Sequence, residues 1–229
     1  MVNIVTPEVR LLAHTRIDEK AVSEWMSIQD ASTDAETLLT MAGRNCYRSF
    51  HRPNEATYDD ADYLRRTLGE QGHWSIAEHA TATLYFTGVS RAFTHELIRH
   101  RHLSYSQLSQ RFVNEDDANI VVPPALRASK RQSLNLRDEM ERTNDVYTYL
   151  VNLLEFEDGL PRKQAREAAR AVVPNMVETR IVVTGNLRAW HEVIQRRTQP
   201  DADAEMQEVM RLAAKELHTV SPVIFPKEK

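Results

Sequence analysis

Residues 80–89 read A-T-A-T-L-Y-F-T-G-V and carry the strongest strand signal in the chain. β-Branched and aromatic side chains suit a pleated surface, so this segment is predicted to be a strand. Gly88 is expected to close it, and Ser90 to cap the helix that follows. A second strand is predicted at residues 180–184, which read R-I-V-V-T, and a short apolar run at residues 9–13 is a third candidate. These segments predict a small sheet.

Helical signals surround these strands. Apolar side chains at helical spacing, capping residues and helix-breaking Gly or Pro residues mark each segment. No linker, low-complexity segment or internal repeat interrupts the chain. The sequence therefore predicts one α+β domain spanning residues 1–229, with helices packed around a small central antiparallel sheet. The predicted helices cover residues 34–47, 58–69, 91–101, 127–157, 161–170, 186–197 and 202–218.

Composition narrows the class of protein. The 229 residues include 33 acidic and 29 basic side chains, for a formal net charge of −4. A mildly acidic protein is not a general polyanion binder, so any nucleotide or nucleic-acid site must be local. Cys46 is the single cysteine, which excludes an internal disulfide framework and fits a reducing compartment. Residues 1–16 lack the apolar run of a signal peptide, and no eighteen consecutive apolar residues occur, so a cytoplasmic protein without a membrane span is expected.

Residues 96–111 read E-L-I-R-H-R-H-L-S-Y-S-Q-L-S-Q-R and are the densest cluster of candidate binding side chains. The cluster holds three arginines and no lysine, and guanidinium groups suit bidentate contacts with phosphate or carbonyl oxygens. A helix continuing to Phe112 would place Arg101 on its apolar stripe, so we expect the helix to end near Arg101 and His102. The serines that follow favour an irregular, polar loop. With no G-x-G-x-x-G or G-x-x-x-x-G-K-[ST] loop in the chain, this segment is the main candidate for a nucleotide site.

Other readings of the polar clusters remain open. The spacing of His95, His100 and His102 does not match a zinc-protease helix, and flanking arginines would repel a divalent cation, so no metal is expected. Cys46 is a candidate nucleophile, although a lone helical cysteine is more often packed. Residues 72–79, G-H-W-S-I-A-E-H, hold two histidines and a glutamate that a hydrogen-bonded structural knot would also explain.

The segment 99–111 closely resembles the signature of flavin-dependent thymidylate synthases, R-H-R-x-x-S-x-N-x-x-S-x-R. Six of its seven fixed positions match, and Ser106 replaces the usual asparagine, as in actinobacterial members. Residues 72–79 are similar to the family's G-H-x-[ST]-x-x-E-H. The runs A-R-A-V-V-P at 169–174 and G-N-L-R-A-W at 185–190 extend the resemblance in family order.

The resemblance implies a specific reaction. Such enzymes make dTMP from dUMP, take the one-carbon unit from 5,10-methylenetetrahydrofolate, and use NADPH to reduce a bound FAD. They need neither a metal nor a protein nucleophile, and they are homotetramers whose sites form between subunits. Arg197 resembles the catalytic arginine that favours ionisation at N3 of the uracil ring. Many members have a histidine four residues after that arginine as a further flavin contact, and this chain departs from them with Asp201 at that position.

The resemblance also assigns ligand contacts, one residue at a time. Flavin contacts are implied at Ser75, Arg99, His100, Arg101, Gln107, Asn186, Leu187 and Arg188. Contacts with dUMP are implied at Glu96, Leu97, Ile98, Arg99, Gln107, Leu108, Ser109, Gln110, Arg111, Arg170 and Arg197. Two alternatives remain: a nucleic-acid-binding protein that tracks phosphates with residues 99–111, and a flavin- or nucleotide-binding module without catalysis.

Overall fold

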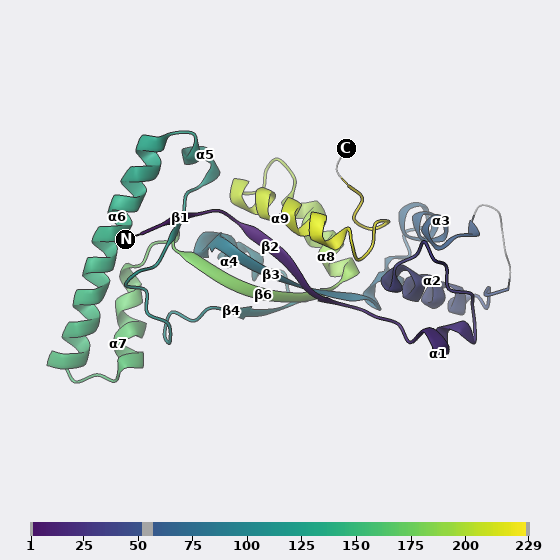
Figure 1. Cartoon of the computed structure of the whole chain (residues 1–229), viewed down its shortest axis with the longest axis horizontal. Helices are drawn as coiled ribbons and strands as arrows, with labels where there is room; N and C mark the ends of the chain where they lie inside the picture. Colours follow the sequence, from purple (N-terminus) through teal and green to yellow (C-terminus); the bar gives the residue numbers. More distant parts are fainter. Residues whose placement is uncertain (1, 52–56, 228–229) are drawn as a thin grey trace.

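A four-stranded antiparallel sheet in the order β2-β3-β6-β4 forms the centre of the molecule (Figure 1). The computed structural model describes residues 2–51 and 57–227. A second, two-stranded sheet pairs β1 with β5 in parallel. The strands are β1 (Ile4–Val5), β2 (Glu8–His14), β3 (Thr81–Ser90), β4 (Leu103–Gln107), β5 (Ile120–Val121) and β6 (Glu178–Asn186).

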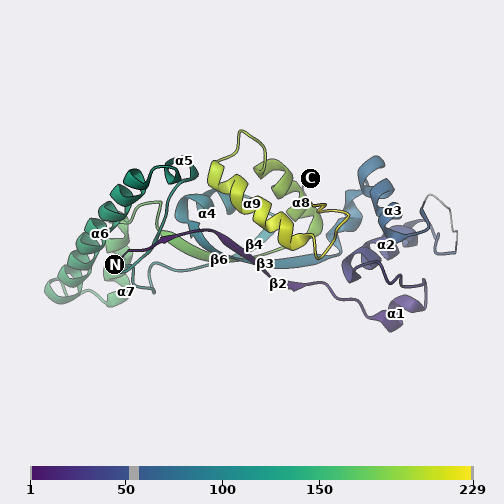
Figure 2. The ribbon, with the colours of Figure 1, turned by 45° about the horizontal axis from the view of Figure 1, so that its top comes forward.

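Helices cover one face of the larger sheet and extend the molecule at both of its ends. α4, α8 and α9 lie over the sheet, α1 to α3 lie at one end and α5 to α7 at the other (Figures 1 and 2). The predicted α+β class, with helices around a small central antiparallel sheet, is confirmed. The α-helices are α1 (Glu19–Ser23), α2 (Asp34–Cys46), α3 (Asp60–Leu64), α4 (Arg91–Leu97), α5 (Pro124–Arg127), α6 (Lys130–Asn152), α7 (Arg162–Ala169), α8 (Leu187–Arg197) and α9 (Ala204–Leu217). Short π-helical segments are η2 (Arg65–Glu70) and η4 (Leu153–Glu157), and 3₁₀ segments are η3 (Trp74–Glu78) and η5 (Arg170–Val172).

The strand predicted at residues 80–89 is confirmed as β3, and its alternating burial determines how the sheet meets its helices. Ala82, Leu84 and Phe86 are buried in the main core, while the residues between them are more exposed. This period of two places the apolar side chains on the face that α4, α8 and α9 cover. Trp190 of α8 is fully buried there, and its indole nitrogen donates to the carbonyl of Ala82 at 3.0 Å. The sheet and its helices therefore share one core.

Each inner strand runs directly into a helix through a capping side chain, as predicted. Ser90 Oγ accepts from the backbone N–H of Phe93 at 3.0 Å, and Asn186 Oδ1 accepts from that of Ala189 at 2.8 Å. The Ser90 hydroxyl and backbone N–H also donate to the buried carboxylate of Glu205 in α9, at 2.6 and 2.8 Å. These caps satisfy N–H groups that a helix start leaves without partners, and they fix the starts of α4 and α8 on the sheet.

Residues 96–111 do not fold as predicted. The helix ends at Leu97 rather than near Arg101, and residues 103–107 form strand β4 rather than an irregular loop. Leu103 lies opposite Gly185 of β6, where a side chain would overlap Leu103 Cδ2. The missing side chain lets β4 approach β6 closely, and the ladder hydrogen bonds override the loop preference of the serines.

Two smaller expectations also need correction. The predicted helix over residues 127–157 is divided into α5, α6 and η4, with a break before Lys130. Cys46 ends α2 and is exposed, so it is not a packed helical cysteine. The strand candidate at residues 9–13 is confirmed as β2.

Candidate active site

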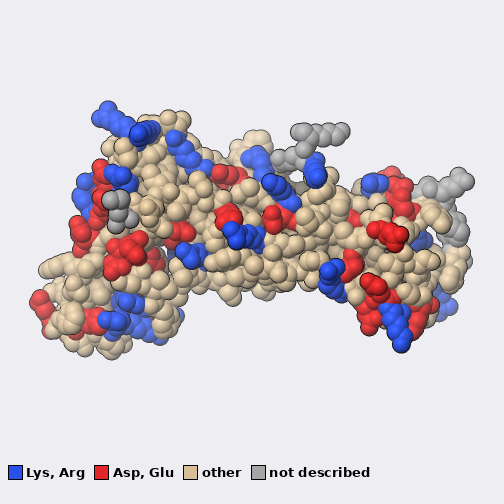
Figure 3. Space-filling model, viewed as in Figure 1, with Lys and Arg blue, Asp and Glu red and all other residues tan. Residues whose placement is uncertain are grey.

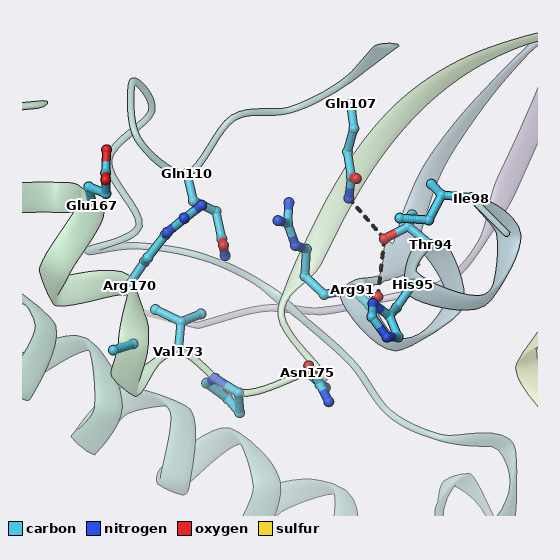
Figure 4. A pocket seen from close by; sticks show the side chains of 12 residues that line it. Arg91, Thr94, His95, Ile98, Gln107, Gln110, Glu167, Arg170, Val173 and Asn175 are labelled. Atoms are coloured by element: carbon cyan, nitrogen blue, oxygen red, sulfur yellow. Dashed lines mark hydrogen bonds between the residues drawn. The ribbon is translucent and has the colours of Figure 1, made fainter. Parts of the chain in front are cut away.

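A cavity of about 530 Å³ opens between α4, the end of β4 and η5 (Figure 4). Four of the residues expected to contact dUMP line it: Ile98, Gln107, Gln110 and Arg170. They come from three separate parts of the sequence, which the antiparallel pairing of β4 with β6 brings together. The fold therefore creates one concave site from residues that the sequence places up to 72 positions apart, from Ile98 to Arg170.

The wall of this cavity is held by a short hydrogen-bond chain. The side-chain amide of Gln107 donates to Thr94 Oγ1 at 2.8 Å, and the Thr94 hydroxyl donates to the carbonyl of Arg91 at 3.1 Å (Figure 4). Gln107 Nε2 also lies 3.4 Å from Thr179 Oγ1 of β6. The Gln107 amide is thus oriented by α4 and β6, and its carbonyl oxygen remains available to a ligand.

Arg91 is a cation of this cavity that the sequence reading missed. In Figure 4 it lies between the side formed by Arg170 and Gln110 and the side formed by Gln107. Burial lowers the pKa of Arg91, although the nearby Glu115 carboxylate acts in the opposite direction. Its Nη1 donates to the carbonyl of Leu108 at 3.2 Å. An isolated arginine in the first turn of a helix gave no signal in the sequence.

Glu115 is a second group that the sequence did not single out. Its side chain is buried, and burial raises the pKa of its carboxyl to about 7, with Arg91 lowering it.

Arg170 forms no ion pair with any acidic group in the described part of the chain. The cavity therefore contains a guanidinium without a carboxylate partner, which suits an anionic ligand.

A second groove, of about 290 Å³, contains two of the three arginines of the 99–111 segment. Arg99, His100 and Arg101 line it together with Arg196 of α8. The three arginines make no ion pair with a described carboxylate. Tyr105 of β4 fixes the turn that carries them, because its hydroxyl lies 2.8 Å from the carbonyl of Leu97 and 2.7 Å from that of His100. Burial raises the pKa of Tyr105 to about 12, so this hydroxyl stays a donor.

Ser75 and Arg188 line a third hollow, of about 430 Å³, beside the stacked rings of Trp74 and His191, whose centroids are 4.0 Å apart. Arg188 and Asn186 also line a neighbouring hollow of about 250 Å³. Arg188 donates to Glu78 at 2.7 Å, so the carboxylate in the 72–79 block is paired with α8. Glu78 is therefore paired with Arg188 instead of forming the suggested hydrogen-bonded cluster with the neighbouring histidines.

Arg197 of α8 is held by a residue of α4 and by a residue of the turn that follows α4. Its Nη1 donates to Glu96 of α4 at 2.9 Å, and its Nε donates to His100 Nε2, also at 2.9 Å. His100 lines the second groove, whereas Arg197 and Glu96 are not among the residues that line either cavity. The arginine expected to be catalytic is therefore connected to the second groove through His100 and to α4 through Glu96.

The structure gives the remaining candidates different surroundings. The side chains of Leu97 and Leu187 are fully buried in the core, so only their backbones can meet a ligand. The backbone N–H of Leu108 donates to the carbonyl of Arg180, and Ser109 Oγ accepts from the N–H of Arg111 at 3.4 Å. Arg111 lies 3.6 Å from Glu167, another residue of the first cavity. Asp201 is exposed in the turn after α8.

Metal binding and membrane insertion each require a recognisable arrangement of side chains. Within residues 2–51 and 57–227, no group of three or more His, Cys, Asp or Glu side chains is arranged to hold a metal ion. None of the described helices combines the length and the apolar character that crossing a membrane requires.

Comparison with known proteins identifies the family. A family model described as "Thymidylate synthase complementing protein" matches residues 27–223. The flavin-dependent thymidylate synthase of Mycobacteroides abscessus is 44% identical over 234 residues, covering 98% of this chain and 91% of that protein. The enzyme of the same name from Corynebacterium aurimucosum is 41% identical, with 98% of this chain and 92% of that protein covered.

A solved structure shares the fold. The crystal structure of thymidylate synthase X from Helicobacter pylori, solved with FAD and dUMP, aligns with a TM-score of 0.64 over 96% of this chain and 98% of that chain, at 20% sequence identity. The family resemblance carried by residues 72–79 and 99–111 is confirmed by the full-length matches. The chain therefore belongs to the family of flavin-dependent thymidylate synthases.

Proposed function

We propose that this chain converts dUMP to dTMP by reductive methylation, with FAD as cofactor, NADPH as reductant and 5,10-methylenetetrahydrofolate as one-carbon donor. Family membership over nearly the whole chain supports the reaction. The observation that carries the site assignment is Arg197, which donates hydrogen bonds to Glu96 of α4 and to His100 of the second groove.

The first cavity is proposed to bind dUMP. Arg170, which has no ion pair in the described part of the chain, and the partly buried Arg91 suit the phosphate, and the Gln107 amide is already oriented by its hydrogen bond to Thr94. Arg197 is proposed to contact the pyrimidine carbonyls and to stabilise negative charge that develops on the ring. The full proposed set is Glu96, Leu97, Ile98, Arg99, Gln107, Leu108, Ser109, Gln110, Arg111, Arg170 and Arg197.

The second groove and the hollows beside α8 are proposed to hold FAD. The guanidinium groups of Arg99, Arg101 and Arg196, which have no ion pair among the described residues, fit a pyrophosphate, and Ser75 leaves room for close approach. Bound FAD would supply the hydride, so the protein's own part is to bind, orient and stabilise charge. The full proposed set is Ser75, Arg99, His100, Arg101, Gln107, Asn186, Leu187 and Arg188.

The assembly is proposed to be a homotetramer with sites shared between subunits. The candidate contacts are distributed over several open cavities of one chain. Sites completed by a neighbouring subunit would explain why Arg99 and Arg101 find no acidic partner within the described part of their own chain. Light scattering of the purified protein measures the assembly directly.

Replacing Arg170 with glutamine should weaken dUMP binding about 10- to 100-fold, because a charged hydrogen-bond partner of the phosphate is lost. Titration calorimetry with dUMP measures the change. Arg142→Gln is the matched control, since Arg142 lies on the surface of α6 and pairs only with its helix neighbour Glu139. Equal affinity in the Arg170 variant and the wild type would remove Arg170 from the dUMP site.

The absorbance spectrum tests the cofactor assignment. Purified protein, or protein reconstituted with FAD, is expected to be yellow, and NADPH is expected to bleach the flavin band. A colourless protein that takes up no added FAD would overturn the proposed function.

The charge pattern argues against the alternative of a nucleic-acid-binding protein. Figure 3 shows acidic and basic side chains interspersed on the viewed face rather than a continuous basic stripe. A protein that binds nucleic acid through phosphate contacts should have an affinity for RNA or DNA that falls steeply as the salt concentration rises. Tight dUMP binding without RNA or DNA binding supports the enzyme, whereas the reverse supports the alternative.

A further inference from the structure

The orientation of Arg197 is set by two acceptors from one neighbouring segment. Glu96 Oε2 lies 2.9 Å from its Nη1, and His100 Nε2 lies 2.9 Å from its Nε. The Arg197 side chain is only 19% exposed. A guanidinium has five N–H donors in a fixed plane, so two hydrogen bonds to different nitrogens fix the direction of the other three.

The hydrogen bond to His100 requires one protonation state of the imidazole. The Nε of arginine always carries hydrogen, so the His100 Nε2 facing it has none, and the ring proton must be on Nδ1. Burial, followed by the charges of Arg197 and Arg196, lowers the pKa of His100. A neutral ring is what the geometry needs, because a protonated ring would present a donor to a donor.

The surroundings of His100 are mostly cationic. Arg196 and Arg197 face it from α8, Arg99 and Arg101 flank it in the chain, and His102 shares its groove. Two carboxylates lie in the same region: Glu96, which is engaged with Arg197, and Glu192 of α8, which is engaged with Arg188. The Tyr105 hydroxyl bonds the His100 carbonyl at 2.7 Å and so fixes the backbone of this residue. The net effect of these groups favours the neutral imidazole.

We propose that His100 is a positioning residue for Arg197: its neutral Nε2, together with Glu96, holds the guanidinium with its remaining donors directed at the substrate. This role is additional to the flavin contact proposed above, and it rests on the proposed function only where turnover is measured. If His100 has this role, the turnover rate should fall when the His100–Arg197 hydrogen bond is lost, even where the imidazole itself is still present.

Nitrogen-15 NMR of histidine-labelled protein tests the hydrogen bond without any catalysis. In the wild type, His100 is expected to be a neutral Nδ1–H tautomer with a pKa below the ordinary histidine range. In Arg197→Leu, the tautomer preference should weaken and the pKa should rise. A His100 that is Nε2–H in the wild type, or that is unaffected by Arg197→Leu, would overturn the inference even if the enzyme makes dTMP.

A double-mutant cycle tests whether His100 acts through Arg197. His100→Leu should lower kcat about 10- to 100-fold, since small misplacements of a catalytic group cost that much. In the Arg197→Lys background, the same change should cost less than about two-fold, because the interaction is already lost. Equal factors in both backgrounds would contradict the proposal. Measuring FAD content in each variant separates a positioning effect from lost cofactor.

The pH profile adds a readout that a purely structural histidine would not change. As pH falls through the lowered pKa of His100, the imidazole gains a proton, the acceptor disappears and kcat should fall. His100→Gln retains an acceptor at similar reach but does not titrate, so its profile should lack this acid limb. The exposed His14 provides the control: His14→Gln should keep the limb. An acid limb unchanged in His100→Gln would count against the proposal.

Discussion

Replacing Arg197 with lysine should lower turnover about 10²- to 10³-fold, the usual cost of losing one preorganised donor at a developing negative charge. Lysine keeps the positive charge but loses the planar fork, so it cannot bond Glu96 and His100 and still present two donors to a uracil carbonyl. The free energy of unfolding should change by less than about 1 kcal/mol, because the Glu96 side chain of this ion pair is 44% exposed and ion pairs with a solvent-exposed partner contribute little. Steady-state dTMP formation and thermal unfolding measure the two effects.

The matched control for this substitution is Arg142→Lys on α6. Arg142 pairs with Glu139 on the protein surface and lies outside the proposed site. Its substitution should leave turnover and stability at wild-type values. If Arg197→Lys also retained wild-type turnover, the catalytic assignment of Arg197 would be wrong, and the charge on the uracil ring would have to be stabilised elsewhere.

Replacing Gly88 with alanine should destabilise the protein by about 2–4 kcal/mol. Gly88 has φ = +61°, and an added Cβ would overlap the backbone oxygen of Thr6 and lie 2.8 Å from its carbonyl carbon. A left-handed backbone with a side chain costs about 1 kcal/mol or more, and overpacking against rigid backbone typically adds about 1–3 kcal/mol. Gly88 also lies where the pairing of β3 with β6 shifts register between Phe86 and Val89. Thermal or denaturant unfolding measures the loss.

Gly69→Ala is the control for this prediction. Gly69 lies in η2, has no positive φ, and nothing beyond its chain neighbours and its own helix backbone lies within 4 Å of the position an added Cβ would take. The substitution should be neutral or slightly stabilising, since alanine lowers the entropy of the unfolded chain. Equal stability of the Gly88 and Gly69 variants would show that the segment before β2 yields easily to the added methyl group.

The sheet and its helical caps were predictable because their signals are local. The strand over residues 80–89, the Ser90 cap and the Asn186 cap each depend on neighbouring side chains, and these three predictions are confirmed, although the strand continues past Gly88 to Ser90. Strand β4 was missed because its pairing depends on the close approach of Leu103 to Gly185, 82 positions away in the sequence. Serine's local preference for loops was the stronger signal at short range.

For the candidate site, too, the local features were predictable from the sequence and the long-range contacts were not. The arginine cluster was visible in the sequence because its members are neighbours, and the family motif connected it to Arg170 and Arg197. The contacts that orient those groups were not visible. Arg91 and Glu115 gave no pattern, and the bond between His100 and Arg197 joins residues 97 positions apart. Such contacts appear only once the sheet has placed α4 and α8 over one face.

The most direct test of the account is dTMP formation by the purified, FAD-loaded protein. With dUMP, NADPH and 5,10-methylenetetrahydrofolate all present, we expect dTMP to accumulate over many turnovers, and omission of FAD or NADPH should abolish it. Protein that binds FAD and dUMP, yet forms no dTMP under these conditions, would contradict the assignment of catalysis to this chain.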